Sequence, residues 1–137
     1  MNVLCAEDSQ DVLRDSPNPI LVYGAAGFLK YTNPAFEILS GFKANEIIGM
    51  KPPFPWWPED DALYKMAFEI SLTKGSVYKA IKFKTKEGTC FYVDINTSPL
   101  NGNQQAVQNW FDVTNDIIAR QQIQNLIRNA TMRMAQV

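Results

Sequence analysis

The chain has 137 residues, of which 46% are hydrophobic and 20% charged, and its 13 basic and 14 acidic side chains leave a formal charge of −1. Length and composition predict one globular domain, and the near-neutral charge gives no bulk field that would hold nucleic acid or an anionic membrane. The sequence contains no histidine. This excludes Ser-His-Asp and Cys-His catalysis, imidazole-bound zinc, haem with a proximal histidine, and a phospho-accepting histidine in this segment.

The two cysteines, Cys5 and Cys90, are far apart and in no metal-binding spacing, so we expect free thiols, no metal site and a cytoplasmic protein. Residues 16–29 lack charge, but prolines and glycines interrupt them, and they fall short of the ~20 residues of a spanning helix. Glu7 and Asp8 stand where a signal peptide would have basic residues. We therefore expect neither a membrane segment nor export.

The N-terminal part of the chain predicts one helix and one hairpin. Residues 3–14 place apolar side chains at roughly helical spacing, and the prolines of 15–19 would end that helix. The apolar runs 20–23 and 28–32 flank a glycine-bounded turn, which is typical of a β-hairpin.

A short helix with defined ends is predicted directly after this hairpin. Asn33 is suited to cap its N-terminus, Pro34 suits the first helical position, and Gly41 suits a left-handed C-cap. Another helical turn is expected at 43–48, and the four prolines of 51–58 predict an irregular, aromatic-rich loop.

The second half of the chain predicts a helix, three strands and a long final helix. The helix begins at Pro58, ends before Gly75 and carries an apolar stripe of Leu63, Met66, Ala67 and Ile70. The strands are expected at 77–85, 89–98 and 104–112. The tail 115–137 lacks glycine and proline, and its residues Ile123, Ile127, Ala130 and Met134 have the spacing of a coiled-coil seam.

This order of elements and five short motifs resemble a PAS domain. The motifs are 16–23 with 27–36, Ser40-Gly41-Phe42, 46–49, the turn 86–89, and Asp112-Val113-Thr114 before the final helix. Each motif is common by itself, but together they stand in the family's order over residues 12–116.

The resemblance implies an α+β fold: a five-stranded antiparallel sheet with short helices on one face, an N-terminal flanking helix and a long C-terminal signalling helix. We accordingly divide the chain into a flanking helix at 1–15, a PAS sensor domain at 16–114 and a coiled-coil-like linker helix at 115–137. Ligands or cofactors of this family lie between the sheet face and the helices.

A ligand between these layers would be small and apolar or aromatic, with Tyr23 and Thr97 as polar handles. A core filled by side chains alone is the alternative. The candidate pocket residues are Tyr23, Phe36, Leu39, Leu63, Met66, Ile70, Phe83, Ile95, Thr97 and Trp110.

No cofactor is expected from the resemblance. Flavin domains of the light–oxygen–voltage type have a reactive cysteine that 49–58 lacks, and the positions matching their flavin-holding amides are Phe83, Val93 and Trp110. Histidine-ligated haem is disfavoured because the chain has no histidine.

The resemblance implies a non-catalytic sensory and signal-relay domain of a larger bacterial signalling protein, such as a sensor histidine kinase of a two-component system or a diguanylate cyclase. Asp112 and Thr114 would pass a change in the cavity or the interface to the final helix. The expected partners are a second copy, in a parallel homodimer, and an effector domain in the full-length chain. The alternative is a purely structural homodimerisation module with a filled core and no ligand.

Overall fold

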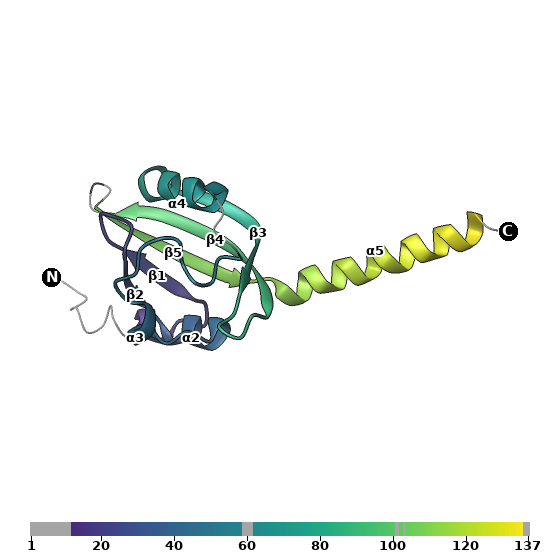
Figure 1. The fold of residues 1–137 in the computed structure, drawn as a ribbon, viewed down its shortest axis with the longest axis horizontal. Coiled ribbons are helices and arrows are strands. Elements are labelled where there is room, and N and C mark those ends of the chain that lie inside the picture. Colours follow the sequence, from purple (N-terminus) through teal and green to yellow (C-terminus); the bar gives the residue numbers. More distant parts are fainter. Residues whose placement is uncertain (1–11, 59–61, 101, 103, 136–137) are drawn as a thin grey trace.

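A five-stranded antiparallel sheet forms the centre of the computed structural model, which describes residues 12–58, 62–100, 102 and 104–135 (Figure 1). Its strand order is β2-β1-β5-β4-β3. The strands are β1 (Ile20–Tyr23), β2 (Leu29–Thr32), β3 (Ser76–Lys84), β4 (Cys90–Leu100) and β5 (Gln105–Asp112), and the helices are α2 (Pro34–Ser40), α3 (Ala44–Ile47), α4 (Ala62–Lys74) and α5 (Thr114–Ala135). This is the α+β fold that the sequence predicts. Of the predicted N-terminal helix, residues 12–15 are helical and the rest lies outside the described residues.

The central strand β5 pairs with β1 on one side and β4 on the other. Its register sets Gln108 opposite Thr97 and Trp110 opposite Ile95. The predicted alternation of β4 is confirmed, since its inward residues Phe91, Val93, Ile95 and Thr97 are all buried. Side chains two residues apart share a face of a sheet, so Gln108 and Trp110 point to the same side.

Asn33 organises the start of α2 and ties it to β1. Its Oδ1 accepts hydrogen bonds from the backbone N–H groups of Phe36 (3.2 Å) and Ile20 (2.9 Å). Its Nδ2 donates to the carbonyls of Leu13 (3.0 Å) and Asn18 (2.9 Å). At the other end, Gly41 has a φ of 80°, a left-handed conformation that suits glycine. Both predicted caps of this helix are therefore confirmed.

The irregular segment before α4 turns its aromatic rings inward. Trp56 is fully buried, stacks on Phe54 with 4.7 Å between ring centroids, and meets the edge of Phe36 at 5.1 Å. Trp110 of β5, also fully buried, meets Phe36 at 5.3 Å. Aromatic side chains bury large areas and favour such edge contacts, so this loop forms part of the core.

Helix α4 packs a different face from the one that its apolar stripe predicts. Leu63, Met66 and Ile70 are 70%, 57% and 47% exposed. The buried positions are Phe68 and Ser71. Periodicity alone did not identify this face, because the sheet side offers aromatic neighbours for Phe68 and hydrogen-bond partners for the Ser71 hydroxyl.

Strand β3 contains a bulge between Tyr78 and Ile81. At the bulge, Ala80 has a φ of 53°, and its N–H donates to Oδ1 of Asp94 at 2.8 Å. A bulge inserts an extra residue and so reverses the alternation of inward side chains. Ser76 contacts the α4 hydroxyl of Ser71 before the bulge, whereas Ile81 packs on the core after it.

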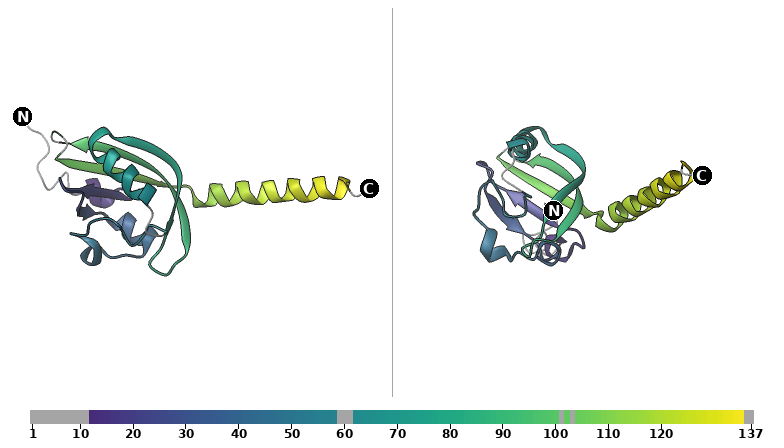
Figure 2. Two further views of the ribbon diagram at one scale, coloured as in Figure 1. Left: turned by 45° about the horizontal axis from the view of Figure 1, so that its top comes forward. Right: turned by 45° about the vertical axis from the view of Figure 1, so that its right-hand side comes forward.

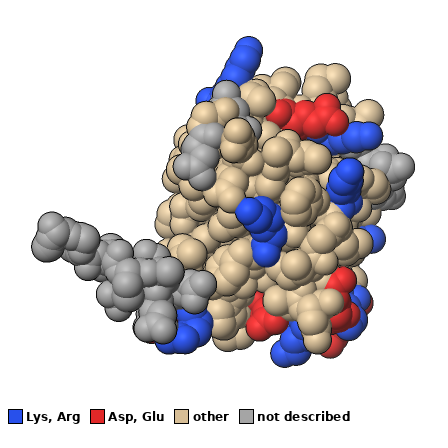
Figure 3. All heavy atoms as spheres, turned by 90° about the vertical axis from the view of Figure 1, so that its left-hand side faces the viewer, with Lys and Arg blue, Asp and Glu red and all other residues tan. Residues whose placement is uncertain are grey.

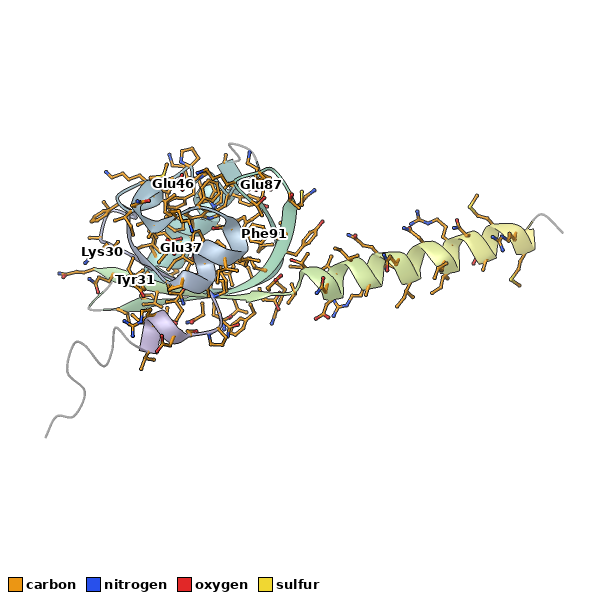
Figure 4. The ribbon with its side chains drawn as sticks, turned by 90° about the horizontal axis from the view of Figure 1, so that it is seen from below. Lys30, Tyr31, Glu37, Glu46, Glu87 and Phe91 are labelled. Carbon is orange, nitrogen blue, oxygen red and sulfur yellow. The ribbon has the colours of Figure 1, made fainter. Side chains whose placement is uncertain are left out.

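Helix α5 leaves the far end of β5 and projects away from the body of the domain (Figures 1 and 2). None of its described side chains is buried, and in Figure 4 they stand out on all sides of the helix. No described helix is long and apolar enough to cross a membrane.

The surface in Figure 3 mixes both signs of charge among uncharged residues. Lysine and arginine side chains are scattered over this face, the acidic ones lie toward its upper and lower edges, and neither sign gathers into a continuous patch.

Candidate ligand pocket and exit helix

A pocket of about 230 Å³ lies between α4, the aromatic loop and the inner face of the sheet. The sheet supplies its floor, and α4 with the aromatic loop supplies its walls. Leu63 and Tyr78, both exposed, lie at its edge. The lining residues are Tyr23, Trp56, Trp57, Leu63, Tyr64, Ala67, Phe68, Ser71, Tyr78, Ile81, Phe83, Ile95, Thr97 and Gln108.

The structure brings together some of the predicted pocket residues and separates others. Tyr23, Leu63, Phe83, Ile95 and Thr97 line the pocket.

The other predicted residues lie elsewhere. Phe36 and Trp110 are fully buried in the aromatic core behind it, and Leu39 packs against that core from α2. Met66 and Ile70 point to solvent, because α4 turns its other face to the sheet. These five residues are corrections to the predicted lining.

Gln108 is the lining residue whose absence from the prediction matters most. It is 6% exposed and stands between Ala106 and Trp110 on the inward face of β5. A lone polar residue on the otherwise apolar inward face of this strand was the available signal. The remaining missed residues come from the aromatic loop, which has no periodicity, from the misassigned face of α4, and from β3, where Tyr78 and Ile81 flank the bulge.

Gln108 holds a polar network at the floor of the pocket. Its Oε1 accepts hydrogen bonds from the Tyr23 hydroxyl and from Nε1 of Trp110, both at 3.0 Å. Burial raises the pKa of Tyr23 well above its ordinary value, because the buried phenolate would be poorly solvated. The phenol therefore stays protonated and remains a donor to Gln108 at neutral pH.

Thr97 carries a second polar group on this floor, directly opposite Gln108 in the β4–β5 register. The residue is 5% exposed, and its Oγ1 has no hydrogen-bond partner among the described residues. Nearby Ser71 differs, because its hydroxyl bonds to the Ala67 carbonyl and to Ser76, each at 2.7 Å. Buried hydroxyls are normally paired, so the unpaired hydroxyl of Thr97 is a position in the pocket where a ligand could supply the missing hydrogen-bond partner.

The junction with α5 is held to β4 by Asp112 and Thr114. Oδ1 of Asp112 accepts from the N–H and the hydroxyl of Thr114, at 3.0 and 2.6 Å. The Thr114 oxygen in turn accepts from the N–H of Tyr92 at 3.0 Å, and the N–H of Val113 donates to the Tyr92 carbonyl at 2.9 Å. The negative charge of a carboxylate at a helix N-terminus also interacts favourably with the helix dipole. The predicted relay residues thus connect the exit helix to the strand that carries Thr97.

The predicted seam of α5 is exposed along its length. Ile123, Ile127 and Met134 are 56%, 62% and 76% exposed, and Ala130 is exposed as well. Leu126 and Met132 add apolar surface beside them. Free Cys90 is exposed at the start of β4, whereas Cys5 lies outside the described residues. Within the described ranges, no cluster of histidine, cysteine or acidic residues could hold a metal ion.

The family model of the PAS fold matches residues 7–117. The chain therefore belongs to the PAS family, whose members are sensory domains. No curated protein matches the chain.

Solved structures share this fold at low sequence identity. An RNA-binding light-oxygen-voltage receptor aligns with a TM-score of 0.73 and 23% identity over 93% of this chain and 40% of that chain. A domain of a sensory box sensor histidine kinase/response regulator from Geobacter sulfurreducens aligns with a TM-score of 0.66 and 15% identity. The alignment covers 78% of this chain and 93% of that chain. A third similar structure is the PAS domain, in complex with ethanol, of a LuxR-family transcriptional regulator from Burkholderia thailandensis. It aligns with a TM-score of 0.64 and 12% identity over 77% of this chain and 97% of that chain.

These similarities show the fold and leave ligand and effector open. The present chain spans 40% of the length of the RNA-binding receptor. Because light-oxygen-voltage structures are among the similar ones, the comparisons do not support the prediction that flavin is disfavoured. They give no evidence for a bound cofactor here either.

Proposed function

We propose that this chain is a ligand-sensing PAS domain that passes a change in its pocket through β4 to α5, and so to an effector domain such as a histidine kinase. The observation that carries the proposal is the pocket of about 230 Å³ with the unpaired, buried hydroxyl of Thr97 on its floor. A domain with a filled core would leave neither free space nor an unpaired polar group at this position.

The route from pocket to exit helix follows one strand. Thr97 lines the pocket, and Tyr92 of the same strand binds Thr114 at the start of α5. These two positions are five residues apart, or about 17 Å at the rise of a β-strand. A ligand that shifts β4 would act directly on the hydrogen bonds that set the direction of α5.

Flavin is not part of the proposal. Phe83, Val93 and Trp110 are apolar or nearly so and fully or almost fully buried, which leaves no amide at the positions where the family resemblance implies flavin contacts. The fold similarity to light-oxygen-voltage structures is the observation that favours flavin binding. Absorbance of the purified protein near the flavin bands decides between them.

Native mass spectrometry of the purified chain, at two concentrations and beside a denatured sample, tests the sensing proposal. A mass excess that disappears on denaturation is expected, and its value begins to identify the ligand. A sample with no excess is then titrated with small aromatic compounds. The absence of binding by all of them would contradict a ligand-sensing role.

The exposed apolar seam of α5 supports a second candidate function, a structural homodimerisation module. Ile127→Asp places a charge in the proposed seam, whereas Asn129→Asp places the same charge outside it. Under this function, sedimentation shows a dimer for the wild type and Asn129→Asp and a monomer for Ile127→Asp. Monomers at every concentration for all three proteins would exclude it.

A further inference from the structure

The orientation of the Gln108 amide determines what the pocket floor offers a ligand. An indole N–H only donates, so the amide atom 3.0 Å from Nε1 of Trp110 is the oxygen. The Tyr23 hydroxyl bonds to that same oxygen. Nε2 is therefore at the opposite end of the amide, and no described residue accepts a hydrogen bond from it. Two N–H donors of a residue that lines the pocket and is only 6% exposed therefore have no partner among the described residues.

Thr97 adds a hydroxyl to these donors. The two residues are direct partners across β4 and β5, and side chains at such positions have Cβ atoms about 5 Å apart. Both line the pocket, and Oγ1 of Thr97 has no partner. One acceptor atom of a ligand between them would satisfy polar groups that the protein leaves unpaired.

The walls of the pocket restrict the rest of the ligand. Its described lining has no acidic or basic side chain and is dominated by tryptophan, tyrosine and phenylalanine rings. Burial of an ionised group without a partner is strongly unfavourable, so a carboxylate or an amine does not suit this site. A cavity of about 150 Å³ holds one benzene ring, and the 230 Å³ here accommodates a ring with a short substituent.

We infer that the pocket takes a small, uncharged aromatic molecule with a carbonyl-type acceptor, which binds between Nε2 of Gln108 and the hydroxyl of Thr97. This inference rests on the proposed sensing function and specifies its ligand class.

Three probes of similar size test this ligand class by isothermal titration calorimetry: acetophenone, ethylbenzene and benzoate. Transfer out of water by itself favours ethylbenzene, which has no polar group to desolvate. The inferred site reverses this order, because ethylbenzene leaves the amide and hydroxyl unpaired. We expect acetophenone to bind about tenfold more tightly than ethylbenzene, and benzoate to bind most weakly.

Thr97→Val removes the hydroxyl at nearly constant volume, and Thr32→Val is its matched control. Thr32 is also buried with an unpaired Oγ1, but it does not line the pocket. Both variants are expected to fold, since each removes an unpaired buried hydroxyl. Thr97→Val should reduce the preference for acetophenone about fivefold, and Thr32→Val should leave it unchanged. Gln108→Met, if it folds, should abolish the preference.

The outcomes separate the inference from the function on which it rests. Equal binding of acetophenone and ethylbenzene, tighter binding of benzoate, or an equal effect of both threonine variants would overturn the ligand class while leaving a sensing pocket. Failure of all three probes to bind would instead overturn the sensing function, and the ligand class with it.

Discussion

Asn33 connects several segments of the N-terminal half through the hydrogen bonds of its side chain. It is fully buried, and its amide makes four hydrogen bonds, which join α2, β1 and the segment before β1. Few residues could replace it, because the site needs two acceptor contacts and two donor contacts from one short side chain.

Substitution of Asn33 by alanine leaves buried backbone N–H and C=O groups unpaired. We expect a loss of about 2–4 kcal/mol in the free energy of unfolding, measured by urea denaturation. Asn33→Asp keeps the acceptor contacts and loses the donors, so it should fall between the wild type and Asn33→Ala. A change of less than about 0.5 kcal/mol for Asn33→Ala would contradict this role.

The raised pKa of Tyr23 predicts that the stability of the folded protein falls as pH rises in the alkaline range. Its pKa is raised in the folded protein, so the folded state retains a proton that the unfolded chain loses above about pH 10. Its contribution to stability is fully present below that pH and is lost as pH rises toward the folded pKa.

The comparison of wild type with Tyr23→Phe isolates this effect. The stability difference between them should shrink by up to about 1.4 kcal/mol for each pH unit above 10. Urea denaturation between pH 8 and about pH 11 measures it. A difference that stays constant over this range would contradict the raised pKa.

At the scale of the element, α4 shows which side chains support the pocket wall. Phe68 meets the rings of Tyr23 and Phe54 at 4.9 and 5.4 Å, whereas Ile70 on the same helix is 47% exposed. Phe68→Ala should cost about 3–5 kcal/mol of unfolding free energy. Ile70→Ala should cost less than about 1 kcal/mol, and equal costs in urea denaturation would contradict this packing.

The junction of β4 and α5 depends on the hydroxyl of Thr114. Thr114→Val leaves the N–H of Tyr92 without its acceptor, so we expect faster hydrogen exchange of that amide and about 1–2 kcal/mol lower stability. Thr114→Ser keeps the oxygen and should retain slow exchange. Unchanged exchange at Tyr92 in Thr114→Val would contradict a role for this hydroxyl in holding α5.

Local signals predict the elements of this fold better than the faces that they bury. The caps Asn33 and Gly41 and the alternation of β4 depend on neighbouring residues, and all three were predictable. The face of α4 depends on aromatic rings supplied by a loop that has no period. The bulge at Ala80 depends on the Asp94 carboxylate from the neighbouring strand, so sequence spacing did not reveal it.

Part of the candidate site was predictable, because some of its residues carry local signals and others depend on contacts between distant parts of the sequence. Tyr23 lies at the end of an apolar run and Thr97 on a strand of clear alternation, and both were predicted as polar handles. Gln108 was missed although it bonds to Tyr23, because its contact joins residues 85 positions apart in the sequence. Long-range pairing between β1 and β5 creates this network, and its one local signal is the polar side chain of Gln108 at an inward position of β5.

At the scale of the whole molecule, pocket and exit helix share one structural element. The sheet carries the pocket floor on one face, and β4 carries both Thr97 and the amide that holds Thr114. Because none of the described side chains of α5 is buried, its direction is set by the hydrogen bonds of Thr114 at this junction. A small displacement of β4 would therefore be amplified along the 22 residues of the helix.

Amide hydrogen exchange with and without saturating acetophenone tests this coupling most directly. If the pocket communicates with α5, exchange should change both at the pocket and at the amides of Tyr92 and Ile117, which bond to Thr114 and to the Val113 carbonyl. Changes confined to α4 and β3, with Tyr92 and Ile117 unaltered, would contradict signal relay through β4.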